Sequence, residues 1–205
     1  ELRRRGVIPN ITINQKHLAE DKDKILNIIE NQLAFGIGIS YSDKKYLRDI
    51  EPIITTSNNI VFHVIMGIND ISDVDVLYDF CMSLNKTCKI LVLGYKNYGF
   101  GINYYLKNPA VEDNKYRWYA KLASYFKRKN LVISFDNLAI EQLKLRRYFT
   151  DNGWNRFFMG TDGKYTMYID AVNEQYAVSS TSSNRVSFDD MSLLEFFKQR
   201  AQVAN

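Results

Sequence analysis

Short apolar runs alternate with amphipathic segments through the first two thirds of the chain. The runs are rich in Ile, Val and Leu, and they read GVIPNITIN (6–14), GIGIS (36–40), NIVFHVIMG (59–67), CKILVLGY (88–95) and NLVISF (130–135). Near-continuous apolar runs of this length are typical of parallel strands covered on both faces. The segments between them carry apolar residues at helical spacing, and several begin with Asp, Ser or Asn, which cap helices. The pattern predicts an α/β protein with a mostly parallel sheet.

Two architectures satisfy this alternation of strands and helices. One is an open, doubly wound sheet, and the other is a partial (βα) barrel with its helices outside. From Gly153 onward the pattern changes to strand-like runs separated by the turns TDGK and VNEQ, which predicts a C-terminal antiparallel meander. Asp189 and Asp190 are expected to cap a final helix. We therefore predict two parts, a parallel βα part over residues 1–150, for which both architectures stay open, and a β-meander with a last helix over residues 151–205.

The chain opens on ELRRRG, in which three arginines precede a glycine as in the last turn of a helix. A helix needs more than one turn, so this pattern predicts that the chain is part of a longer protein. The first parallel strand would then have an unpaired edge, which upstream residues or another subunit would cover.

The composition argues against several functional classes. A hydrophobic fraction of 46% and a charged fraction of 24% are ordinary for a globular domain. The net charge of +4 is too small to favour nucleic-acid binding. No apolar run is long enough to span a bilayer and no signal peptide opens the chain, so we expect a cytoplasmic protein. The only cysteines, Cys81 and Cys88, cannot form a four-ligand metal site by themselves.

Ligands of parallel βα proteins bind at the carboxyl ends of the strands, so the residues after each apolar run are candidates. Most of these positions are small or polar, and they are Asn14, Gln15, Ser40, Tyr41, Ser42, Gly67, Asn69, Asp70, Gly94, Tyr95, Lys96, Asp136 and Asn137. Such groups suit a ribose, a carboxylate or an adenine edge better than acid–base catalysis. Helix capping is the alternative role for Ser40, Asp70 and Asp136.

His63 is the one unusual residue within a strand run. A single strand histidine is commonly an interior residue with its hydrogen bonds satisfied, and ligand binding is the alternative. The chain has no Walker loop, no G-x-S-x-G elbow and no H-E-x-x-H motif. GYKNYGFG, which follows a strand run, lacks the spacing of the dinucleotide fingerprint.

Several segments together resemble the later part of a radical S-adenosylmethionine (radical SAM) protein: GVIPNITIN, GIGISYS, FHVIMGINDISDV, KILVLGYKNYGFG, LVISFDN and YTMYIDAVNEQYAVSSTS. The resemblance implies a partial barrel in residues 6–150, followed by a tail that closes over the substrate. It implies that the cysteines of a [4Fe–4S] cluster lie before Glu1. S-adenosylmethionine (SAM) and the cluster would serve the full-length protein, and neither is expected to bind tightly to this chain alone.

The resemblance also assigns site residues. Asn14 matches an asparagine of the family's Asn-Gly pair, although Gln15 replaces the glycine. Ser40 and Ser42 match polar residues that approach the ribose or the methionyl group. Residues that would border the adenine, with side chains or with backbone, are Ile65, Gly67, Ile68, Gly94, Tyr95 and Lys96. Asp70 stands near a position where a glutamate is common.

In related sequences the tail carries cysteines that bind an extra iron–sulfur cluster. Here the matching positions hold Thr166 and either Val178 or Ser179, so the resemblance implies no cluster there and leaves substrate contact open.

Three functional hypotheses follow from the sequence. The first is a radical SAM enzyme, inactive as this chain alone, that abstracts hydrogen from an unknown substrate. The second is a non-catalytic binding or structural module on the same scaffold. The third is an unrelated α/β enzyme for a phosphorylated metabolite, which the lack of an anion-binding glycine loop disfavours.

Overall fold

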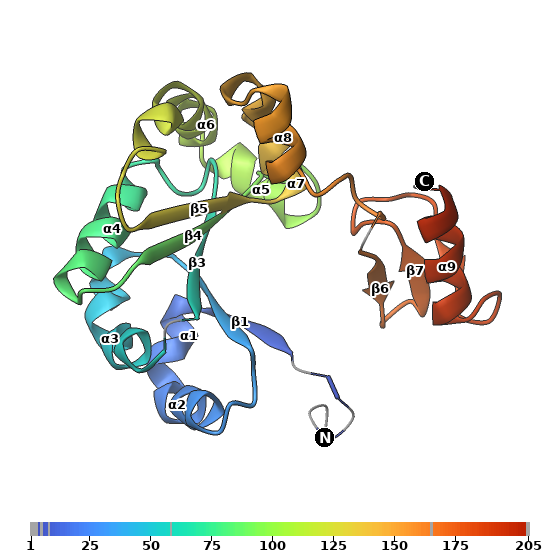
Figure 1. The fold of residues 1–205 in the computed structure, drawn as a ribbon, viewed down its shortest axis with the longest axis horizontal. Helices are drawn as coiled ribbons and strands as arrows, with labels where there is room; N and C mark the ends of the chain where they lie inside the picture. The colour runs from blue at the N-terminus through green and yellow to red at the C-terminus, as the bar shows by residue number, and fades with distance from the viewer. Residues whose placement is uncertain (1–3, 5, 8, 58, 165, 204–205) are drawn as a thin grey trace. The chain divides into compact units, whose positions relative to one another are not determined.

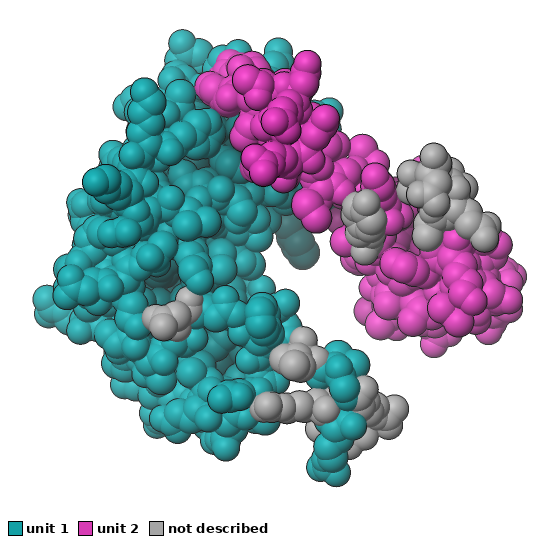
Figure 2. All heavy atoms as spheres, in the orientation of Figure 1, with its two compact units in different colours: residues 1–145 teal, residues 146–205 magenta. Residues whose placement is uncertain are grey.

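A computed structural model describes the chain at residues 4, 6, 7, 9–57, 59–164 and 166–203. The chain divides into two compact units, residues 1–145 and residues 146–205 (Figure 2). The expected helical turn at the start of the chain falls largely on residues 1–3 and 5, which lie outside the described residues.

The first unit is built on a five-stranded sheet. Its strands are β1 (Asn10–Asn14), β2 (Gly36–Ser40), β3 (Ile60–Ile65), β4 (Cys88–Leu93) and β5 (Leu131–Phe135). All neighbouring pairs are parallel, and the strands lie in chain order, β1-β2-β3-β4-β5 (Figure 1). A doubly wound sheet needs a reversal of strand order, whereas a barrel adds strands in one direction. The predicted partial βα barrel is therefore confirmed, and the doubly wound alternative is wrong.

Helices connect successive strands, as the sequence pattern predicts, and a further helix follows β5. They are α1 (Gln15–Glu20), α2 (Lys22–Glu30), α3 (Leu47–Thr56), α4 (Asp73–Ser83), α5 (Phe100–Lys107), α6 (Ala110–Lys121) and α7 (Asn137–Gln142). Figure 1 shows α3 and α4 on the outer side of β3 and β4. Apolar side chains from both layers, among them Ile50, Ile53, Phe62, Leu77 and Ile90, are fully or almost fully buried.

The two faces of the central strands differ in burial, which the near-continuous apolar runs did not predict. On β3 and β4 every second residue is buried, and the alternate residues are half-buried. Phe62 and Val64 belong to the buried face, whereas His63 and Ile65 belong to the other. We call this second face the inner face. In a partial barrel the helices cover only the outside, so the inner face keeps access to solvent.

The second unit begins with α8 (Asp151–Phe157) and continues as a small antiparallel sheet of β6 (Tyr168–Asp170), β7 (Gln175–Ala177) and β8 (Val186–Ser187). The chain then forms the final helix, α9 (Leu193–Val203). The predicted meander and last helix are confirmed. The run NRFF, however, is the end of a helix rather than a strand, because Thr150 caps α8 by accepting a hydrogen bond from Gly153 N.

The cap of α9 is not formed by the expected aspartates. Ser192 and Glu195 form a reciprocal capping box instead. Glu195 Oε2 accepts hydrogen bonds from the Ser192 backbone N–H at 3.0 Å and from its hydroxyl, and Glu195 N donates to Ser192 Oγ at 3.3 Å. Serine followed three residues later by glutamate satisfies amides of the first turn more fully than Asp189 or Asp190 could, because they lie too far upstream.

Candidate functional site

A cavity of about 610 Å³ lies at the carboxyl ends of β3 and β4. Its wall includes Ile65 and Leu93, the last residues of these strands, and the aromatic side chains of Tyr98, Phe100 and Tyr104. The cavity is therefore mainly apolar, and it occupies the edge at which parallel βα proteins bind ligands.

Five of the nine residues that the resemblance assigned to a cofactor line this one cavity: Ile65, Ile68, Gly94, Tyr95 and Lys96. They come from three different places along the chain, the end of β3, the loop after it and the loop after β4. Sequence analysis missed the aromatic residues of α5, which complete the wall. Their signal was present in the sequence, because the helix FGINYYLK is apolar on most of its circumference and none of its residues is buried.

Backbone groups at Gly94 and Tyr95 are already hydrogen-bonded within the chain. Gly94 N donates to Asp136 Oδ1 at 2.9 Å, and Tyr95 N donates to Gln142 Oε1 at 2.9 Å. Gln142 Nε2 donates in turn to Tyr95 O at 2.9 Å. A ligand could use these amides only by displacing these hydrogen bonds, and the backbone contact to an adenine edge stays a prediction.

Gly67 has a structural role that differs from the expected cofactor contact. Its φ is +100°, and its carbonyl accepts a hydrogen bond from Asn114 Nδ2 at 3.0 Å. A Cβ at this position would lie 3.1 Å from Val111 Cγ1 and 3.2 Å from Lys115 Cγ on α6. The glycine thus allows a left-handed turn to pack closely against a helix. Gly67 is not among the cavity-lining residues.

The polar residues after β1 and β2 meet one another rather than the cavity. Gln15 is fully buried, and its Oε1 accepts hydrogen bonds from Ser42 N at 3.0 Å, Asp43 N at 3.2 Å and Ser42 Oγ at 3.3 Å. Asn14 Oδ1 accepts from Lys16 N and caps α1. Asn14 and Ser42 therefore hold the loops at this edge. Ser40 lies on the inner face as the register partner of His63.

The residues after β3 and β5 stabilise helices and loops, which was the alternative to ligand binding. Asp136 caps α7 by accepting from Ala139 N at 2.7 Å. Asp70 accepts hydrogen bonds from Ser72 and forms an ion pair with Arg117 at 3.0 Å. Asp73 is half-buried, and burial raises the pKa of its carboxyl.

His63 is neither fully buried nor hydrogen-bonded. Its side chain is half-buried on the inner face, and burial lowers the pKa of the imidazole. Within the described part of the chain, the ring makes no hydrogen bond to another residue. This position is therefore not the satisfied interior histidine that strand histidines usually are.

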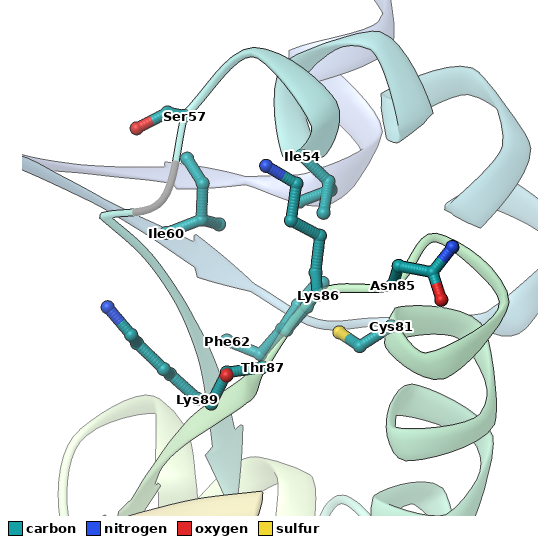
Figure 3. Close-up of a pocket in the computed structure, with 9 residues that line it drawn as sticks. All are labelled: Ile54, Ser57, Ile60, Phe62, Cys81, Asn85, Lys86, Thr87 and Lys89. Atoms are coloured by element: carbon teal, nitrogen blue, oxygen red, sulfur yellow. The ribbon is translucent and has the colours of Figure 1, made fainter. Parts of the chain in front are cut away.

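Cys81 and Cys88 lie together at the opposite end of the sheet from the cavity. Both thiols are buried, and Cys81 lines a pocket of about 240 Å³ with Lys86 and Lys89 (Figure 3). The hydrogen bond to Cys81, with burial, raises the pKa of the Cys88 thiol. Leu93 lines the cavity five residues along β4 from Cys88, which is about 16 Å at 3.3 Å per residue. These cysteines therefore do not fit an iron–sulfur cluster at the cavity.

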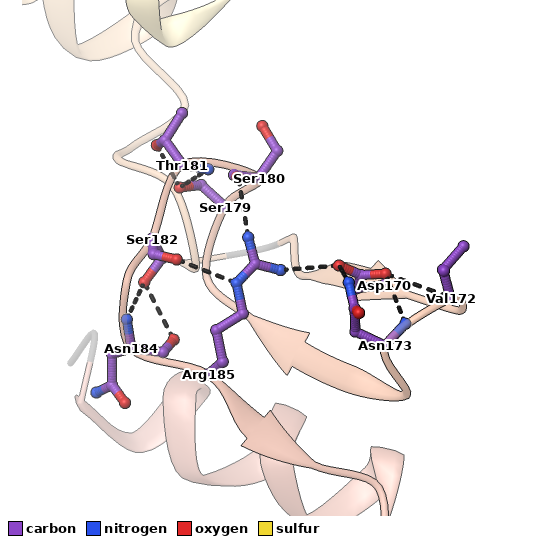
Figure 4. Close-up of polar contacts among 9 residues, drawn as sticks. All are labelled: Asp170, Val172, Asn173, Ser179, Ser180, Thr181, Ser182, Asn184 and Arg185. Atoms are coloured by element: carbon purple, nitrogen blue, oxygen red, sulfur yellow. Dashed lines mark hydrogen bonds and ion pairs between the residues drawn. The ribbon is translucent and has the colours of Figure 1, made fainter. Parts of the chain in front are cut away.

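The hydroxyl-rich run of the second unit has a structural explanation. Arg185 donates to Ser182 O from Nε at 3.2 Å and to Ser180 O from Nη2 at 3.0 Å, and Nη1 lies 3.4 Å from Asp170 Oδ2 (Figure 4). Small residues let the loop curl closely enough for one guanidinium to hold two of its carbonyls. These contacts explain the small residues of the loop, and substrate contact in this part of the chain stays a prediction.

Among the described residues, no group of three or more His, Cys, Asp or Glu side chains is arranged so that it could hold a metal ion. The described helices are too short or too polar for one of them to cross a membrane. In comparisons with known proteins, no family model, curated protein or solved structure matches this chain.

Proposed function

We propose that the first unit is the cofactor-binding part of a radical SAM enzyme and that its cavity binds the adenine end of SAM. The observation that carries this proposal is the gathering of Ile65, Ile68, Gly94, Tyr95 and Lys96 around one apolar space at the carboxyl ends of the strands. A planar, weakly polar ring suits walls made of aliphatic and aromatic side chains.

The residues of the chain would contribute binding and orientation. The side chains of Ile65 and Leu93 would form the floor under the ring, and the aromatic residues of α5 would cover it. In radical SAM enzymes the bound cofactor supplies the radical that abstracts hydrogen. The described residues hold no ligands for the cluster, so no step of that chemistry is assigned to them.

A second candidate is a non-catalytic module that binds an apolar molecule on the same scaffold. The observation that favours it is the engagement of the Gly94 and Tyr95 amides within the chain, which removes two donors for adenine. The identity of the ligand separates the two functions.

Calorimetric titration of SAM into the full-length protein, as wild type and as the Phe100→Ala variant, tests the proposal. Phe100 lines the cavity and is 93% exposed, so its truncation should weaken SAM binding by about tenfold, as for loss of one stacking contact, without unfolding the protein. Leu106→Ala is the matched control, because Leu106 lies on the same helix, is 74% exposed and does not line the cavity.

Equal SAM affinity in wild type and Phe100→Ala would remove the cavity from the cofactor site. Absence of SAM binding, together with Phe100-dependent binding of an apolar dye, would favour the non-catalytic module.

A further inference from the structure

The inner face carries a polar group of residues that no cofactor contact explains. Thr12 on β1, Gly38 and Ser40 on β2, and His63 on β3 lie on this face of neighbouring strands. Thr12 is the register partner of Gly38, and Ser40 is the register partner of His63. Two hydroxyls and an imidazole are thus brought together from three strands.

Gly38 provides the space that the imidazole occupies. A Cβ on Gly38 would lie 2.5 Å from His63 Cε1 and 2.6 Å from His63 Nε2, closer than real contacts allow. The same Cβ would lie 2.9 Å from Thr12 Oγ1. The imidazole therefore leans across β2 toward Thr12, and only the absence of a side chain at Gly38 permits it.

The polar atoms of this group are not used within the protein. In the described residues, neither the ring of His63 nor the hydroxyls of Thr12 and Ser40 take part in a side-chain hydrogen bond. A half-buried imidazole normally finds a partner, because an unpaired polar group costs free energy. The hydrogen-bond partner of the imidazole must therefore be solvent or a ligand on the inner face.

The position of the group connects it to the cavity. His63 lies two residues before Ile65 on the same face of β3, and Ile65 lines the cavity. Two residues of a strand span about 6.6 Å, so a small molecule held at His63 would border whatever occupies the cavity.

We propose that His63 and Thr12, with Ser40 beside them, form a second binding site on the inner face for a neutral, hydroxyl-bearing molecule. A neutral imidazole has one hydrogen-bond donor and one acceptor, and a hydroxyl group can bind to either, because it both accepts and donates. The residues next to His63 on this face, Val61, Ile65 and Leu91, are uncharged, and Lys89 lies one residue further along this face, beside Val61, so a charged group at the imidazole would have no counter-charge in direct contact. This site does not depend on which molecule fills the cavity.

The test uses the fact that the chain has two histidines. With histidine labelled at Cε1, the NMR spectrum should hold two such resonances, and His17 on the exposed side of α1 is the internal control. Lactamide and isobutyramide are neutral and differ by one hydroxyl in place of one methyl. Each is titrated to high millimolar concentration into the whole chain.

We expect lactamide to shift the His63 resonance in a saturable way and isobutyramide to shift it at least severalfold less, with His17 unchanged by both. Thr12→Val should abolish this difference, because it removes the hydroxyl with little change of shape. Equal shifts from the two amides in wild type, or no His63 shift with lactamide, would overturn the proposal. SAM is absent from this experiment, so its outcome is separate from that of the cofactor titration.

Discussion

His63 couples the stability of the first unit to pH. Burial lowers the pKa of its imidazole below the value of about 6.5 in an unfolded chain. Above that value the ring is neutral in both states and contributes nothing. As the pH falls through 6.5, the unfolded state binds the proton first, so the free energy of unfolding decreases.

Urea denaturation should therefore show a larger loss of stability between about pH 7.5 and pH 5 for wild type than for His63→Gln. His17 is present in both proteins and cancels in the comparison. Equal losses in the two proteins would mean that the imidazole is as well hydrated in the folded state as in the unfolded chain.

Two glycines show how the role of a residue depends on its neighbours in the fold. Gly67 and Gly38 occur in similar apolar surroundings in the sequence. In the structure, Gly67 forms a left-handed turn against α6, whereas Gly38 leaves room for the ring of His63. A substitution at Gly67 would strain the backbone whatever the ligand, so it is a poor probe of cofactor binding.

At the scale of elements, the capping box fixes where α9 begins. Ser192→Ala should lower the free energy of unfolding of the second unit by about 1 kcal/mol, because the Glu195 amide in the first turn loses its acceptor. Far-UV circular dichroism during denaturation measures the change. Ser192→Asp restores an acceptor at the cap and should recover most of the loss. If Ser192→Asp is as unstable as Ser192→Ala, the reciprocal hydrogen bonds do not stabilise the helix.

At the scale of the whole molecule, each unit has buried residues of its own. Trp118 is fully buried in the first unit, and its Nε1 donates to Asn69 O at 2.9 Å. In the second unit Tyr176 stacks on Phe188 and Phe196, with centroids 4.4 Å and 5.4 Å away. Each unit can therefore hold its own structure through its own contacts.

A reporter for one unit tests this independence. In Trp154→Phe, Trp118 is the remaining tryptophan and reports on the first unit. Adding Asp170→Ala removes the acceptor of two backbone amides and a partner of Arg185 in the second unit. We expect the midpoint of the Trp118 fluorescence transition to stay the same. A shift of that midpoint would show that the two units unfold as one.

The sequence by itself determined the strands, the helices between them and the change to an antiparallel meander. These features depend on local periodicity and on turn and cap residues, which act over a few positions. It also indicated the edge at which Gly94, Tyr95 and Lys96 meet, because parallel strands place their carboxyl ends together, whereas Ile65 and Ile68 were assigned by the resemblance.

Only the tertiary structure decided the strand order, the hydrogen bonds that occupy the Gly94 and Tyr95 amides, and the aromatic wall from α5. Each of these depends on partners that are distant in sequence, such as Gln142 for Tyr95. The same is true of His63, whose surroundings are set by Gly38 and Thr12 on two other strands. Which residues of two parallel strands are register partners depends on packing between segments distant in sequence, and these partners decide which side chains meet on a face.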